Sequence, residues 1–339
     1  HQTMQVPFNE PAWGSAWLPE FQDPTVTPKY DGTTTLPINF TRPYIGYAGR
    51  ISGTFAGHMA NFGSSSQYHG LQVGLNRRMY RNVQFGLAYT WSKVLGTSSS
   101  YATWGDLMHP TNIRKADYGP LTFDRTQVLT VNYIIDLPKG ARPGTVLDNA
   151  VGRTILNGWQ ISGITSLSSG APSSLSWSWT GVSDPVRNRM ITGNEDWAPR
   201  VVLTGNPNKS PGDRTLYEWI NTNVVLPAPK GSQGMESAKN PVRGPGINNW
   251  DISVFKRINF GSEERYLQLR LEMYNAFNHT QWSDVNRSVQ FDRTTGKITN
   301  LPSALGGGGG RFGFGALGGA YGTSVRSPRN IQVAAKFYF

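Results

Sequence analysis

The sequence predicts an all-β protein, an antiparallel up-and-down β-barrel or part of one, with roughly eight to ten strands and long loops. Three observations support this fold class. Apolar and polar residues alternate in several separate segments, glycine and proline are abundant at 39 and 22 of 339 residues, and the alternation continues to the last residue of the chain. A period of two residues is typical of a strand with one apolar face, whereas a helix would repeat every 3.6 residues.

The last nine residues carry apolar side chains at every second position, from Ile331 to Phe339. A strand that closes a membrane barrel must be paired to its end, because lipid leaves no water to satisfy an open edge. We therefore interpret Ile331, Val333, Phe337 and Phe339 as a barrel-closing strand and an assembly signal. The alternative is the ordinary buried last strand of a soluble domain.

The composition favours a membrane barrel over a soluble core. Aromatic residues make up 12% of the chain while hydrophobic residues reach only 37%, and the mean hydropathy is -0.41. A barrel with a polar interior needs an apolar residue only at every second strand position. No segment approaches the ~18 consecutive apolar residues of a membrane helix, so a membrane protein of this composition has to span with strands.

The net charge of +11 raises nucleic acid as a partner, but the basic residues are scattered and form no basic helix. We therefore expect no nucleic-acid partner, and expect lipopolysaccharide phosphates or anionic solutes to be better matches for the surface Arg and Lys. The chain has no cysteine, which excludes thiol chemistry, disulfides and cysteine-bound metals.

Residues 1–41 are proline-rich and without a sustained period, and predict an extended segment or a loop. Residues 42–339 predict the barrel region. Within it, strands are expected at residues 45–55, 67–79, 82–95, 127–137, 156–169, 175–179, 250–260, 267–273 and 331–339. Only Tyr80 and Arg81 separate the second strand from the third, which indicates a tight hairpin. Arg270 and Glu272 alternate with leucines in a later strand, so that polar face is expected to line the lumen, since charge facing lipid costs ~2–4 kcal/mol at the midplane.

Three stretches, 97–120, 181–246 and 279–327, are expected to be long loops. Short turns at one end and long loops at the other are typical of outer-membrane barrels. We expect a single helical turn at Leu216–Ile220. Gly306–Gly310 is not followed by Lys-Ser or Lys-Thr and has no strand-to-helix context, so it is interpreted as a flexible loop rather than a phosphate site.

The sequence contains no motif or residue spacing that is typical of an enzyme active site. Its five histidines lack metal-ligand spacing, no Gly-x-Ser-x-Gly motif occurs, and we expect no catalytic residue, no metal and no cofactor. Asp124 and Arg125 are interpreted as a local ion pair of the lumen. Exposed rings in long loops stack on sugars or on partner proteins, so the candidate binding aromatics are Trp177, Trp179, Trp197 and Trp219. The alternative is that these rings hold the loops together.

Seven segments, in order along the chain, resemble the C-terminal part of the TonB-dependent receptor-like outer-membrane proteins, in particular the Oar-like group with an N-terminal carboxypeptidase regulatory-like domain. They are Tyr68–Arg78 (YHGLQVGLNRR), Ala88–Lys93 (AYTWSK), Asp124–Pro138 (DRTQVLTVNYIIDLP), Leu156–Gly163 (LNGWQISG), Arg243–Lys256 (RGPGINNWDISVFK), Leu267–Gln281 (LQLRLEMYNAFNHTQ) and Pro328–Phe339 (PRNIQVAAKFYF).

This resemblance implies a bacterial outer-membrane location, assembly by the barrel-assembly machinery and contact with outer-membrane lipid. Family members also have a plug and a TonB-contacting segment, which we do not find here, so we expect a fragment that cannot transport alone and that works with an upstream plug-bearing portion. The alternative is a processed structural protein at the cell surface or outside the cell, which assembles with copies of itself into an oligomer, tube or filament. Phe339 is expected to be a true C-terminus and His1 not a true beginning.

Overall fold

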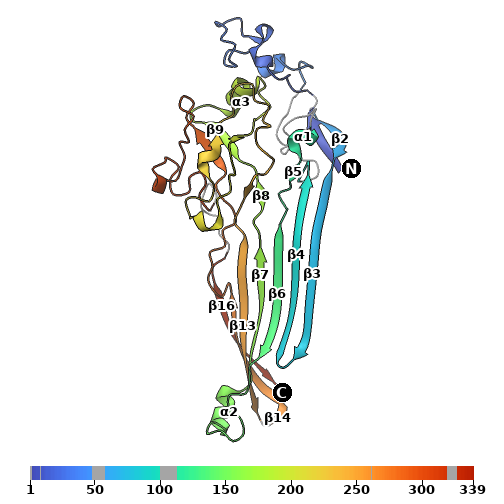
Figure 1. The fold of residues 1–339 in the computed structure, drawn as a ribbon, viewed down its shortest axis with the longest axis vertical. Helices are drawn as coiled ribbons and strands as arrows, with labels where there is room; N and C mark the ends of the chain where they lie inside the picture. The colour runs from blue at the N-terminus through green and yellow to red at the C-terminus, as the bar shows by residue number, and fades with distance from the viewer. Residues whose placement is uncertain (1, 8, 48–57, 100–112, 261, 319–326) are drawn as a thin grey trace.

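The computed structural model describes residues 2–7, 9–47, 58–99, 113–260, 262–318 and 327–339. Its main feature is an antiparallel sheet of seven long strands in the order β16-β14-β13-β7-β6-β4-β3, with a short eighth strand, β5, paired to the end of β4. Loops gather at one end of the sheet and tight connections at the other (Figure 1). The predicted all-β fold class is confirmed.

The long strands coincide with the alternating segments of the sequence. They are β3 (Ser66–Tyr80), β4 (Val83–Gly96), β6 (Gln127–Asp136), β7 (Trp159–Ser168), β13 (Ile247–Phe260), β14 (Ser262–Tyr274) and β16 (Asn330–Tyr338), and β5 is Gly119–Pro120. Each is paired antiparallel to its neighbour. The strand expected over 156–169 begins only at Trp159, because a short helix occupies the residues before it.

The register places one apolar side chain beside another across the whole sheet. Val73 lies opposite Tyr89, and Tyr89 lies opposite Leu129. At the other side, Val254 lies opposite Leu271, and Leu271 opposite Val333. Because partners in a ladder project to the same face, these residues form one continuous apolar face.

The opposite face of the same sheet is polar. Its residues include Gln72, Thr130, Ser166, Asp251, Arg270, Glu272 and Lys336. The alternation in the sequence predicted that Arg270 and Glu272 share a polar face. The structure places both on that face.

Aromatic side chains lie toward both ends of the apolar face. Tyr89, Trp91 and Trp250 lie toward the end with the long loops, and Trp159, Phe260 and Phe337 toward the end with the tight turns. The rings of Phe260 and Phe337 are 5.9 Å apart. Two girdles of amphipathic or aromatic rings flanking an apolar band are typical of barrels that cross a membrane.

The turn between β3 and β4 differs by one residue from the prediction. Tyr80 still belongs to β3 and pairs with Val83, so the two turn residues are Arg81 and Asn82. Their φ angles are 51° and 68°. Positive φ at both central residues defines a type I′ turn, which matches the twist of the strands, and Asn accepts this conformation better than most residues.

The N-terminal segment contains a strand, although its proline-rich sequence predicted an extended segment or a loop. Strand β1 (Gln2–Pro7) pairs antiparallel with β2 (His58–Ser64) in a separate small sheet. The expected strand at 45–55 lies mostly outside the described residues, and Ile45 to Tyr47, which are described, form no strand.

The long loops contain short elements of their own. These are α1 (Ile113–Asp117), α2 (Ala150–Leu156), α3 (Asp184–Thr192), β8 (Pro172–Ser173), β9 (Ser176–Trp179), β10 (Val202–Leu203), β11 (Val225–Leu226), β12 (Val242–Arg243) and β15 (Ser288–Phe291). Single 3₁₀ turns occur at Ser15–Trp17, Pro19–Phe21, Ile38–Phe40, Pro211–Asp213, Thr222–Val224 and Ser303–Leu305. The helical turn expected at Leu216–Ile220 is wrong, because Ile220 forms a β-bridge with Asn208.

Residues 170–246 and 280–318 fold together into one body at the loop end of the sheet, which we call the loop cap (Figure 1). Strand β9 was expected to be part of the barrel but pairs parallel with β15, which joins the two halves of the cap. A cluster of buried apolar residues fills its interior: Leu175, Trp177, Ile191, Val201, Ile220, Val225, Ala228, Val242, Val285, Val289, Phe291 and Phe314. The cap is therefore a globular unit with its own core, although its sequence predicted long loops.

Substitutions on neighbouring residues of β6 test the assignment of the two faces. Val131→Lys places a charge in the middle of the apolar face and is expected to destabilise the membrane-inserted sheet by ~2–4 kcal/mol, whereas Thr130→Lys on the polar face is expected to cost little. Folded protein in isolated outer membranes, measured by heat-modifiable electrophoretic mobility, compares the two variants. Equal losses would contradict the assignment.

Candidate functional site

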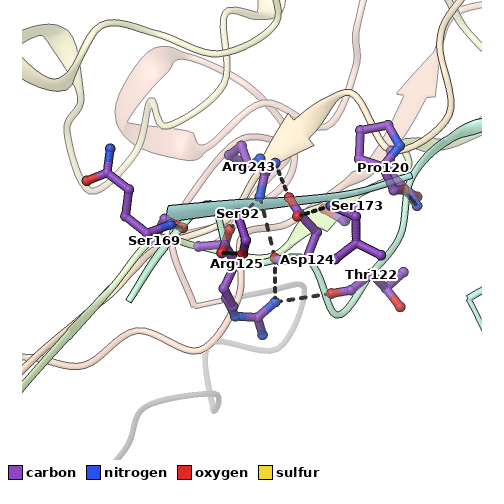
Figure 2. Close-up of polar contacts among 12 residues, drawn as sticks. Ser92, Pro120, Thr122, Asp124, Arg125, Ser169, Ser173 and Arg243 are labelled. Atoms are coloured by element: carbon purple, nitrogen blue, oxygen red, sulfur yellow. Dashed lines mark hydrogen bonds and ion pairs between the residues drawn. The ribbon is translucent and has the colours of Figure 1, made fainter. Parts of the chain in front are cut away.

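The loop cap is joined to the end of the sheet by an ion pair between Asp124 and Arg243. Their side chains are 2.5 Å apart, and the Asp124 side chain is completely buried. Figure 2 shows Arg243 reaching from the cap to Asp124, which lies in the connection that leads into β6. The contact spans 119 residues of sequence and links the two bodies of the protein.

Backbone groups hold both partners in place. The other carboxylate oxygen of Asp124 accepts a hydrogen bond of 2.7 Å from the backbone N–H of Val94 in β4. Arg243 lies in β12, which pairs with β8, and its guanidinium also donates to the carbonyl of Gly170 at 3.2 Å. Both oxygens of this buried carboxylate therefore have partners, which offsets the cost of its burial.

Three further side chains of the cap contact the connection between β4 and β6. Arg200 pairs with the buried Asp117 at 3.1 Å and donates to the carbonyl of Ala116. Lys239 donates to the carbonyl of Thr97 at 2.6 Å. Asn240 donates to the carbonyl of Pro120 at 2.7 Å. Buried polar contacts thus fix the cap to the end of the sheet.

The N-terminal segment lies against the far side of the cap, at α3 (Figure 1). Arg42 pairs with Asp196 at 2.7 Å, and both side chains are nearly buried. Gly193, at φ 69°, ends α3, and a Cβ there would lie 2.2 Å from the Cα of Gly14. Glycine is required at this position both for its left-handed conformation and for the close approach of the two backbones.

Two of the four candidate tryptophans are buried in or beside the core of the cap. Trp177 is 5% exposed, its indole N–H donates to the carbonyl of Pro199 at 2.6 Å, and the Arg187 guanidinium lies 4.9 Å from its ring. Trp197 is 2% exposed, and its ring stacks on Trp13 at 6.1 Å. Their burial supports the interpretation that these rings hold the loops together.

The other two tryptophans are partly exposed at the edge of the same core. Trp179 contacts Trp177 edge to face at 5.7 Å, and the Arg293 guanidinium lies 5.9 Å from its ring. Trp219 donates to the carbonyl of Arg243 at 2.8 Å, with Arg214 stacked 4.5 Å from its ring. The structure therefore does not bring the four tryptophans together into one exposed binding surface.

Clefts lie in the cap and between the cap and the sheet. One of about 390 Å³ is lined by basic side chains from separate segments, Arg187, Arg200, Lys239 and Arg287, with Asp184 as an acidic member. A second cleft of about 290 Å³ shares Arg287 and Thr122 with it and reaches Ser168 and Ile247 on the polar face of the sheet. The second cleft thus lies at the mouth of the polar face, and the first adjoins it within the cap.

Arg187 is a buried base of the first cleft. Its guanidinium donates to Asp184 at 2.9 Å, to the side chain of Asn188 at 2.7 Å and to the carbonyl of Trp177. Burial lowers the pKa of Arg187 from its usual value, and the charge of Asp184 opposes this shift. The group remains charged because the usual arginine pKa lies far above neutral pH.

A third cleft, of about 820 Å³, lies on the polar face at the upper ends of β7, β13 and β14. Its lining includes Ser166, Asn249, Asp251 and Gln281. Asp251 accepts hydrogen bonds from the Asn249 side chain at 3.0 Å and the Asn275 backbone at 2.9 Å. Polar groups therefore continue from the clefts under the cap down the face that the alternation predicted to be the lumen.

The predicted closing residues lie on or beside β16. Ile331 and Val333 lie on the apolar face opposite Met273 and Leu271, and Phe337 lies opposite Leu267. Phe339 follows the end of the strand and stacks on Phe337 at 6.1 Å. Strand β16 pairs with β14 on one side, and its other side is an edge of the described sheet, as is the outer side of β3.

The sequence analysis missed Arg243 and Arg200 as partners of buried carboxylates. It paired Asp124 with Arg125, but Arg125 donates to the carbonyls of Thr122 and Asp124. A signal was present, since Asp124 and Arg243 are the first residues of two of the seven family-like segments. Within the described residues, no group of three or more His, Asp or Glu side chains is arranged to hold a metal ion, and no helix has the length and apolar character needed to cross a membrane.

The sheet is antiparallel, has one apolar face, carries aromatic girdles at both ends and has long loops at one end. These features define the class of membrane-spanning β-sheet proteins. The family model for the outer membrane beta barrel domain matches residues 1–314. The chain belongs to this family, and the protein is located in the bacterial outer membrane.

Two solved structures are similar over most of this chain. FpvA of P. aeruginosa, bound to heterologous pyoverdines, matches 85% of this chain and 21% of its own, with 8% identity and a TM-score of 0.34. The outer membrane transporter YddB from Escherichia coli matches 83% of this chain and 26% of its own, with 8% identity and a TM-score of 0.36. The chain thus spans about a quarter or less of their length. No curated protein matches the sequence significantly.

Removing Arg243 tests the ion pair between cap and sheet. Arg243→Met leaves the buried Asp124 carboxylate without its counter-charge and is expected to destabilise the cap by about 3 kcal/mol. The control Arg287→Met breaks the Arg287–Asp284 pair, whose side chains are 36% and 37% exposed, and is expected to cost less than about 1 kcal/mol. Amide hydrogen exchange of Ile220 and Phe291 measures local opening of the cap, and equal effects would contradict the assigned role.

Truncation of Trp177 tests whether its ring is structural. Trp177→Ala leaves a large cavity in the cap and is expected to cost about 3–5 kcal/mol, again read from hydrogen exchange of the cap core. Trp91→Ala, on the 56% exposed ring of the apolar face, is the control and should leave cap exchange unchanged. Normal cap protection in the Trp177 variant would favour a binding role for the ring.

Proposed function

We propose that this chain is the C-terminal barrel portion of a TonB-dependent receptor-like outer-membrane transporter of the Oar-like group. The observation that carries the proposal is the arrangement at the mouth of the polar face, where a folded cap is fixed by buried ion pairs over polar clefts that continue onto that face. In this role the cap admits a polar solute from outside, the polar face borders its path, and no residue of the chain performs catalysis.

The partners follow from the same proposal. Further strands pair with the open edges of the sheet. A plug-bearing portion fills the lumen, and without it this chain does not transport. The barrel-assembly machinery inserts the sheet through Ile331, Val333, Phe337 and Phe339 of β16. Lipopolysaccharide phosphates contact basic side chains of the cap surface, in keeping with the net charge of +11.

The edges of the sheet also favour a second candidate function. Strands β3 and β16 each have a side without a partner among the described strands, and unpaired strand edges readily pair with another chain. In this alternative, the chain is a processed surface protein whose copies join edge to edge into an oligomer, tube or filament.

Fractionation of the native protein distinguishes these functions. For a receptor, we expect the sequence in the outer-membrane fraction, within or bound to a polypeptide that also carries a plug, as shown by native mass and N-terminal analysis. An isolated chain of 37.4 kDa in soluble, lipid-free polymers would contradict the receptor and support the alternative.

Cross-linking provides an independent measurement, because the chain has no cysteine. Asn76→Cys on β3 and Ala334→Cys on β16 place thiols on the polar face of the two edges. A bifunctional maleimide applied to cells that carry both substitutions on one chain is expected to yield no ladder of multimers if the protein is a receptor. A regular ladder would indicate edge-to-edge assembly, and the single-substitution chains are the controls.

A further inference from the structure

The connection between β6 and β7 is unusual for its end of the sheet. The hairpin from β3 to β4 at this end has a two-residue turn, whereas residues 137–158 form an insert that contains α2. Figure 1 shows α2 at the end of the sheet opposite the loop cap, beside the lower end of β14 in this view. In an outer-membrane barrel the tight turns face the periplasm, so the insert lies at the level of the inner leaflet or just below it.

The insert exposes a stripe of large apolar side chains. Val146, Val151 and Ile155 are 97%, 66% and 58% exposed, and Leu147 lies between them in sequence and is also exposed. Val151 and Ile155 are four residues apart in α2 and so lie on one side of the helix, and Val146 and Leu147 lie in the turn before it. No residue of α2 is buried, so this helix does not contribute its apolar side chains to any core of the described protein.

The insert is nevertheless held in a fixed position. The side-chain amide of Asn157 pairs with both backbone groups of Ala141, at 3.0 and 3.1 Å, and closes the insert at its base. The side chain of Asn149 caps the start of α2 by accepting from the N–H of Gly152 at 2.8 Å. An exposed apolar stripe on an ordered segment indicates a surface that is covered in the native environment.

The insert is attached to the lipid-facing side of the sheet. Trp159 and Lys256 are register partners on the apolar face, with the ammonium 5.2 Å from the indole ring. Both side chains reach the end of α2, since the Trp159 indole donates to the carbonyl of Ile155 at 2.8 Å and Lys256 donates to the carbonyls of Ile155 and Asn157. Tryptophan and lysine are the residues that mark the boundary between hydrocarbon and headgroups.

The charges of the insert fit an anionic headgroup layer. Lys139, Arg142 and Arg153 are basic and Asp148 is acidic, and Asp148 is paired with Arg153 at 2.5 Å. The remaining basic residues of the insert, Lys139 and Arg142, are exposed near its base. Exposed apolar side chains beside basic residues are the features of segments that lie in a membrane interface.

We propose that residues 137–158 form an interfacial anchor, in which the stripe of Val146, Leu147, Val151 and Ile155 inserts into the inner leaflet of the outer membrane beside the lipid-facing side of the sheet. The occupant of this surface is phospholipid, because the stripe adjoins the apolar face through Trp159 and Lys256. The anchor extends the apolar belt of the sheet below its inner aromatic girdle and fixes the depth of the protein in the bilayer.

Single-cysteine labelling tests the proposal, since the chain has no native cysteine to remove. Val151→Cys places a nitroxide label on the stripe, and Arg153→Cys places one on the opposite side of the same helix, 200° away at 100° per residue. Val131→Cys on the apolar face of β6 is the reference for lipid. The folded protein is reconstituted in vesicles of phosphatidylethanolamine and phosphatidylglycerol, and collision of each label with oxygen, which enters lipid, and with a water-soluble nickel chelate is measured.

We expect the label at residue 151 to resemble the label at residue 131, with an oxygen-to-nickel collision ratio several-fold above that at residue 153. A low ratio at residue 151, equal to that at residue 153, would place the stripe in water and overturn the proposal. Protection from both reagents would show that protein rather than lipid covers the stripe, and would overturn it as well. Ile155→Cys repeats the measurement at a second stripe position.

Discussion

The antiparallel register that runs from β3 to β16 is the constraint on which the rest of the structure depends. The strands alternate apolar and polar residues, and the pairing aligns this alternation so that one face of the sheet is mainly apolar. A slip of one residue in the pairing of β14 would move Arg270 and Glu272 to the lipid. The same register brings Trp159 beside Lys256 and so determines where the insert with α2 meets the membrane.

The apolar core of this protein lies outside the sheet, and the reason is physical. Within the membrane, lipid covers the apolar face, so the sheet needs no second layer. The long loops emerge into water, where more than a hundred residues without a core would remain disordered. The long loops are ordered because Trp177, Ile220, Phe291 and their neighbours are buried together in the core of the loop cap.

Buried ion pairs and hydrogen bonds join the cap to the end of the sheet. Apolar packing holds the cap together, while Asp124 and Asp117 at the end of the sheet meet Arg243 and Arg200 of the cap. A buried carboxylate is stable only with its counter-charge and hydrogen bonds present, so these pairs specify one docked position more strictly than apolar contacts do. A fixed position keeps the clefts lined by Arg187 and Arg287 open above the polar face.

The sequence by itself determined the strands of the membrane-spanning sheet, because a period of two residues is a local property that survives in any context. It located β3, β4, β6, β13, β14 and β16 to within a few residues and identified which side of each strand is apolar. The folded cap, the parallel pair of β9 and β15, and the strand β1 depended on tertiary structure, because their short segments have no period of their own and are stabilised by contacts with distant residues. The pairing of Asp124 with Arg243, 119 residues away, was likewise decided only by the fold, since a carboxylate next to an arginine in sequence carries no information about which cation will reach it when it is buried.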